Sequence, residues 1–180
     1  DLTDSGIDNG TPTPGHFGLS VAGEPAQGSR VIYNRLEGTP HAGSTLAGTD
    51  GHGNLNAHIL GGFNDYASGF PHTDAAGFRY GLGVCPFVRL GSSVVFDPDT
   101  FTSPDYANLQ SKAYQAGARI SANSWGMTNN AYTVDAQAYD ALVRDAQPEG
   151  ASFAAAGNQE MVIVFAAGNR GTNRNTVGAP

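Results

Sequence analysis

Short apolar runs typical of β-strands recur along this chain of 180 residues, separated by segments with helical spacing. The runs are Arg30–Asn34, Phe87–Phe96 (with a bend expected at Gly91), Arg119–Asn123 and Met161–Ala167, and Asp1–Thr3 resembles the end of a strand. Met161–Ala167 is the longest stretch without a polar residue. We therefore expect it to form a strand that is buried on both faces.

Three segments have the spacing of amphipathic helices. The first begins at His52, and the third covers Val134–Ala146. The second has Ser103 as its expected N-cap with proline at the first helical position, and it should end near Ala116, before Gly117. The apolar residues expected to face the core are Leu55, Ile59, Leu60 and Phe63 in the first helix and Tyr139, Leu142 and Val143 in the third.

Strands that alternate with helices predict an α/β fold in which helices cover both faces of a mainly parallel sheet. Two long polar segments, Ser5–Ser29 and Asn64–Gly83, are expected to be loops. No change of composition indicates a domain boundary. In such folds, ligands bind beyond the carboxyl ends of the strands, so candidate chemistry is sought there.

Charge and composition exclude several functions. The net charge is −7 and the basic residues are scattered, so no basic stripe exists for nucleic acid. No apolar run approaches the roughly 20 residues of a membrane span. Neither a P-loop nor a Gly-x-Gly-x-x-Gly motif follows a strand, which argues against a nucleotide-binding domain. Cys85 is the single cysteine, which excludes an internal disulfide, and we expect its thiol to be buried and inert.

Short motifs along the chain place an acid, a base and an amide beside glycine. They are Asp4-Ser5-Gly6, Asp50-Gly51-His52-Gly53 and Ala166-Ala167-Gly168-Asn169. Besides a nucleophile, serine-type acyl transfer needs a histidine base, a carboxylate that fixes its tautomer, and a donor for the oxyanion. Asp4, His52 and Asn169 are the candidates for these roles.

Each motif alone is more typical of a turn or a loop, and their order carries the hypothesis. A near-copy of the last motif ends at Asn158, but no apolar strand precedes it. Asn169 directly follows Val162–Phe165, so we favour it as the oxyanion donor. Gly168 is expected to turn the chain sharply off that strand.

Five segments in this order resemble the subtilisin-like serine proteases, the subtilase family (peptidase family S8). They are Asp4-Ser5-Gly6-Ile7-Asp8, Asp50-Gly51-His52-Gly53, Gly83–Leu90, Ser121–Gly126 and Val162–Gly171. The resemblance implies a three-layer α/β fold, serine endopeptidase activity through an Asp-His-Ser triad, polypeptide substrates, no cofactor for catalysis, and secretion. It also implies that Ser124, Trp125 and Gly126 bind substrate backbone, whereas the alternative is a strand end with a core aromatic.

The chain departs from the family pattern in two places. The histidine block has Asn54 where the family has threonine, and the Gly-Thr-Ser block that carries the nucleophile is absent. We therefore expect residues 1–180 to be the N-terminal and central part of one catalytic domain, inactive without its C-terminal remainder. The alternative is a non-catalytic subtilase-like domain that binds peptides or has a structural role.

The sequence leaves metal binding open. By the resemblance, loop acids are candidates for structural calcium, although solvated loop charge is the interpretation we favour. These acids are Asp8, Asp65, Asp74, Asp97 and Asp99. No histidine pairs with cysteine or glutamate at a zinc-ligand spacing. We expect His16, His41 and His72 to be solvated and His58 to pack or point outward.

Overall fold

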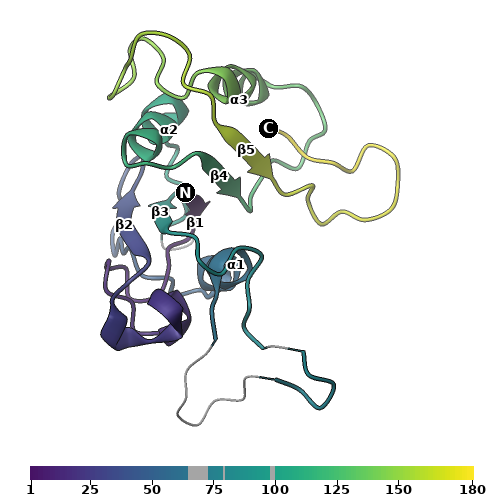
Figure 1. The fold of residues 1–180 in the computed structure, drawn as a ribbon. Helices are drawn as coiled ribbons and strands as arrows, with labels where there is room; N and C mark the ends of the chain where they lie inside the picture. The colour runs from purple at the N-terminus through teal and green to yellow at the C-terminus, as the bar shows by residue number, and fades with distance from the viewer. Residues whose placement is uncertain (65–72, 79, 98–99) are drawn as a thin grey trace.

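A computed structural model, which describes residues 1–64, 73–78, 80–97 and 100–180, contains a five-stranded sheet in the order β2-β3-β1-β4-β5 (Figure 1). The strands are β1 (Leu2–Asp4), β2 (Val31–Leu36), β3 (Leu90–Val94), β4 (Ile120–Asn123) and β5 (Val162–Phe165). Every neighbouring pair is parallel. The parallel α/β fold expected from the sequence is thus confirmed, with the shortest strand, β1, at its centre.

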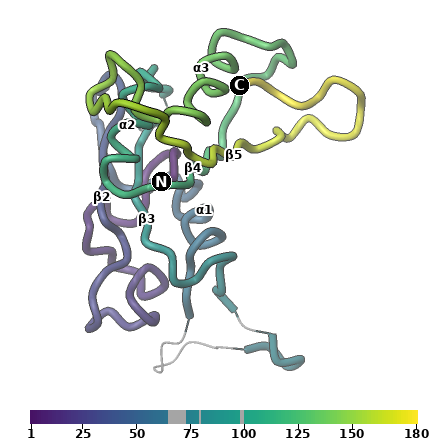
Figure 2. The backbone as a smooth tube through the Cα atoms, turned by 45° about the horizontal axis from the view of Figure 1, so that its top comes forward, coloured from purple at the N-terminus to yellow at the C-terminus, as the bar shows by residue number. Residues whose placement is uncertain are grey.

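Helices cover both faces of the sheet. They are α1 (His52–Gly61), α2 (Tyr106–Gln115) and α3 (Val134–Arg144), and the loop after β1 contains the 3₁₀ turns η1 (Phe17–Leu19), η2 (Val21–Gly23) and η3 (Pro25–Gln27). Ala57 of α1 packs with Leu2 and Val31 on one face. Leu109 of α2 and Leu142 of α3 pack on the other. Figures 1 and 2 show α2 and α3 grouped together, away from α1.

Of the apolar residues of α1 that were predicted to face the core, Leu60 packs against it but Leu55 and Ile59 do not. Leu55 is 61% exposed and Ile59 is 52% exposed. The buried positions are instead Gly53, Ala57 and Gly61, four residues apart. The helix lies so close to the sheet that only small residues fit between them. The larger side chains of Leu55 and Ile59 therefore point away from the sheet.

The expectation that β5 is buried on both faces is wrong. Ile163 and Phe165 pack against the core, whereas Val162 is 57% exposed and Val164 is 52% exposed. The physical reason is position, since β5 is the edge strand and α1 covers the other end of this face.

Two further details of the helices differ from expectation. The N-cap of α2 is Asp105, whose carboxylate accepts the backbone N–H of Asn108 at 2.8 Å, while Ser103 has a φ of +51°. Asp105 directly precedes the first residue of the helix, so its side chain reaches this donor, whereas the Ser103 hydroxyl lies two residues farther back. The helix does end before Gly117, whose φ is +99°.

In α3, Val143 is exposed because the helix buries Tyr139 and Leu142 on a narrower face.

Cys85 is exposed, which corrects the expectation of a buried thiol. Its backbone N–H donates to the carbonyl of Leu60 at the end of α1. The segment therefore runs along the surface beside the helix end and is held there by its main chain. Within the described part of the chain, no helix is both long enough and apolar enough to cross a bilayer.

Candidate active site

The site is built where β1 ends and α1 begins. Asp4 is the last residue of β1, and His52 is the first residue of α1. Nδ1 of His52 lies 2.7 Å from Oδ1 of Asp4. The Asp4 side chain is 3% exposed, whereas that of His52 is 54% exposed. A buried carboxylate thus holds one edge of an accessible imidazole.

The first turn of α1 is fixed by side chains from outside the helix. Oδ1 of Asp50 accepts the backbone N–H of His52 at 3.0 Å and the hydroxyl of Ser5 at 2.7 Å. The Ser5 Oγ in turn accepts the backbone N–H of Gly53 at 3.2 Å. These contacts satisfy helix donors that have no partner within the helix. They also tie the start of α1 to the residue after Asp4, which sets the separation of Asp4 and His52.

The Asp4 carboxylate accepts hydrogen bonds at both oxygens. Besides His52, the backbone N–H of Ser5 donates to Oδ1 at 2.8 Å. The amide Nδ2 of Asn56 donates to Oδ2 at 2.9 Å. Both oxygens of this buried carboxyl group therefore have hydrogen-bond partners.

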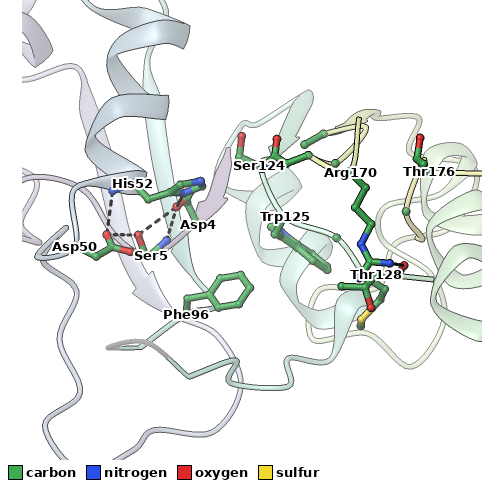
Figure 3. A pocket seen from close by; sticks show the side chains of 16 residues that line it. Asp4, Ser5, Asp50, His52, Phe96, Ser124, Trp125, Thr128, Arg170 and Thr176 are labelled. Carbon is green, nitrogen blue, oxygen red and sulfur yellow. Dashed lines mark hydrogen bonds and ion pairs between the residues drawn. The ribbon is translucent and has the colours of Figure 1, made fainter. Parts of the chain in front are cut away.

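A pocket of about 540 Å³ opens beside this pair (Figure 3). All of the site residues expected from the sequence line it, namely Asp4, His52, Ser124, Trp125, Gly126 and Asn169. They come from the carboxyl ends of β1, β4 and β5 and from the start of α1. The structure therefore brings together residues that are far apart in the chain, at the edge of the sheet where ligands of α/β proteins bind.

Trp125 has a second place in the structure besides the pocket wall. It is 8% exposed, and its ring lies 5.3 Å from that of Phe165 and 5.7 Å from that of Phe101. The side chain is therefore mainly a core aromatic, as in the alternative interpretation, while it also lines the pocket. Ser124 and Gly126, on either side, are the more accessible parts of this segment.

The chain turns at Gly168 as expected, with a φ of +88°, a backbone conformation that favours glycine. This turn follows β5 and places Asn169 on the pocket wall. Asn158 lies in the loop before β5 and does not line the pocket. The structure thus separates the two near-copies of the motif by their position.

Several residues at the site were not assigned a role from the sequence. Ser5 directly follows Asp4 in the sequence, and Asp50 lies two residues before His52. This closeness along the chain could have indicated that both residues belong to the site. Asn56 lies one helical turn after His52, a spacing that indicates the same helix face. Arg170 lines the pocket and donates to the carbonyl of Thr128 at 2.9 Å.

The loop acids mostly bind their own backbone. Oxygens of Asp8 accept the N–H groups of Gly15 and His16 at 2.7 and 3.0 Å. Asp74 accepts the N–H of Phe78 at 2.9 Å. Asp97 accepts a backbone N–H from Thr45 and is fully buried, not solvated.

The described residues contain no cluster of three or more histidine, cysteine or acidic side chains that would suit a metal ion. Asp65 and Asp99 lie outside the described residues, as does His72. His16 is exposed, as expected, and its ring also packs against that of His58, with Nε2 of His58 3.1 Å from Nδ1 of His16. His41 is half-buried.

An aspartate-paired histidine over a pocket at the carboxyl ends of a parallel sheet is the acid–base arrangement of α/β enzymes that transfer acyl groups. The model of the Subtilase family matches residues 1–180, the whole chain. The chain therefore belongs to the subtilase family, a family of serine peptidases. A search of curated proteins found no match.

Proposed function

We propose that this protein is a serine endopeptidase in which Asp4, His52 and Asn169 serve as acid, base and oxyanion donor. The observation that carries the proposal is the 2.7 Å contact between Nδ1 of His52 and the buried carboxylate of Asp4. It is supported by the pocket that these residues share with Asn169.

The chemistry follows from what each group can donate. A carboxylate only accepts hydrogen bonds, so Nδ1 of His52 carries the proton and Nε2 keeps its lone pair. Nε2 then takes the proton of a serine hydroxyl as that oxygen attacks a peptide carbonyl, and later gives it to the leaving amine. Asp4 stabilises the imidazolium formed between these steps. The Asn169 amide donates to the oxyanion of the tetrahedral intermediate.

We further propose that the nucleophile comes from a part of the catalytic domain outside residues 1–180. Two serines line the pocket, Ser5 and Ser124. The Ser5 hydroxyl bonds to Asp50 and lies on the carboxylate side of His52. Ser124 makes no hydrogen bond to His52 among the described residues, and Figure 3 shows it set apart from the imidazole.

Ser124 and Gly126 are proposed to bind the main chain of a polypeptide substrate, because they follow β4 on the pocket wall and are accessible. Secretion is proposed from the family alone. Structural calcium at the loop acids is likewise proposed from the family alone.

The test is a peptidase assay on the full-length gene product. His52→Ala should lower kcat by at least about 10³-fold. Asn169→Ala should lower kcat by about 10²–10³-fold with little change in KM, the magnitude known for the oxyanion-hole asparagine of subtilisin. Asn158→Ala is the matched control and should leave both constants unchanged. A protein that binds peptides and hydrolyses none would establish the non-catalytic alternative.

A further inference from the structure

We propose that Asn56 is a positioning residue that holds the Asp4 carboxylate in the orientation in which it bonds His52. The inference rests on the proposed function, because it gives Asn56 a part in the same acid–base pair. It adds a residue to the site through a contact between α1 and β1 that lies away from the pocket wall.

The two carboxylate oxygens of Asp4 have different partners. Oδ1 receives Nδ1 of His52 at 2.7 Å and the backbone N–H of Ser5 at 2.8 Å. Oδ2 receives Nδ2 of Asn56 at 2.9 Å. Since Asp4 is 3% exposed, water cannot readily replace the amide. Loss of Asn56 would leave a buried, charged oxygen without this donor and the carboxylate free to rotate.

The orientation of the Asn56 amide is set by charge. If the amide were flipped, its oxygen would face the carboxylate oxygen, and two acceptors would repel each other. Nδ2 of Asn56 also lies 3.3 Å from Nδ1 of His52. That nitrogen already donates its proton to Asp4, so the amide lies beside the Asp4–His52 hydrogen bond and does not compete for it.

The place of Asn56 on the helix makes this contact possible. It lies four residues after His52 on α1, so both side chains project from the same side of the helix. One helix therefore supplies the base and the donor that orients its acid. Since the amide touches Asp4 and His52 but does not line the pocket, we expect it to act through them, not on the substrate.

Two near-isosteric variants of the full-length gene product test the inference. Asn56→Leu removes the donor, and kcat should fall by about 10–100-fold with KM unchanged. Asn56→Asp keeps the shape but sets an acceptor against Oδ2 at neutral pH, so it should lose at least as much. Its activity relative to wild type should recover as pH falls, because a protonated carboxyl group donates again. Leu55→Ala, at the exposed neighbouring position, is the control.

Proton NMR of the same variants gives a readout that does not depend on turnover. The Nδ1–H of His52, assigned by its loss in His52→Ala, should give a protected low-field resonance in wild type. In Asn56→Leu it should exchange with water at least about tenfold faster. A variant that loses kcat only because it unfolds would also lose cooperative thermal unfolding. If Asn56→Leu unfolds in this way, the role of Asn56 is tested by whether the activity of Asn56→Asp recovers as pH falls.

The two hypotheses fail differently. A wild-type protein without peptidase activity, or a fully active His52→Ala, would overturn the proposed function. An active wild type that needs His52, together with Asn56→Leu that keeps wild-type kcat and a protected Nδ1–H, would overturn the role of Asn56 alone.

Discussion

The carbonyl oxygen of Gly6 lies against Gly53, so close that a Cβ on Gly53 would collide with it. Gly6 follows β1, and Gly53 belongs to the first turn of α1. Their contact brings the backbone beside Asp4 against the backbone beside His52. The glycines of the two motifs are therefore what allows the acid and the base to meet.

Gly53→Ala should destabilise the protein by about 1–3 kcal/mol, because the added methyl group meets backbone that cannot move aside. Helix propensity predicts the opposite, a gain of about 1 kcal/mol for alanine over glycine. Urea unfolding distinguishes the two, with Leu55→Ala as a surface control. Equal or greater stability of Gly53→Ala would show that the contact is looser than described.

Arg30 is buried, and its guanidinium binds backbone carbonyl groups instead of a carboxylate. It donates to Gly18, Ser20, Gly61 and Val88 at 2.7, 3.0, 2.5 and 2.8 Å. Arg30→Met keeps most of the side-chain volume but leaves these oxygens without their donor. We expect a loss of about 2–4 kcal/mol in the free energy of unfolding.

The matched control for Arg30→Met is Arg174→Met, since Arg174 is exposed. This change should alter stability by less than about 0.5 kcal/mol. Comparable effects of the two substitutions in urea unfolding would mean that the buried guanidinium does not hold these loops together.

His16 should make stability depend on pH. Burial, then the positive charge of His58, lowers the pKa of His16 below its ordinary value of 6.5, and Asp8 opposes this in part. The unfolded chain therefore binds a proton at higher pH than the folded one, so stability should be lost as pH falls through 6.5. His16→Asn keeps a side-chain acceptor for the N–H of Gly18 and should weaken this dependence. Thermal unfolding between about pH 7 and pH 5 measures it, and an unchanged slope in the variant would refute it.

The strands and the site motifs were predictable because they depend on local sequence. Apolar runs located β2 and β4 closely, and glycine after a strand located the turn at Gly168. The order of the motifs, compared with a known family, was what joined Asp4 to His52. Their separation along the chain alone does not indicate a contact.

The rest depends on tertiary packing. Leu55 and Ile59 were wrongly predicted to face the core, because the distance between helix and sheet is set by glycine contacts that hydrophobicity does not record. Asn56 was not assigned because its partner, Oδ2 of Asp4, comes from a distant strand. The exposure of β5 follows from which strand lies at the edge of the sheet, and composition does not determine that order.

Labelling with a fluorophosphonate probe, followed by mapping of the modified residue, tests the central claim most directly. We predict that the full-length gene product is labelled on one serine outside residues 1–180, that His52→Ala abolishes the labelling, and that residues 1–180 alone are not labelled. Stoichiometric labelling of a serine within residues 1–180, or unchanged labelling of His52→Ala, would contradict the account.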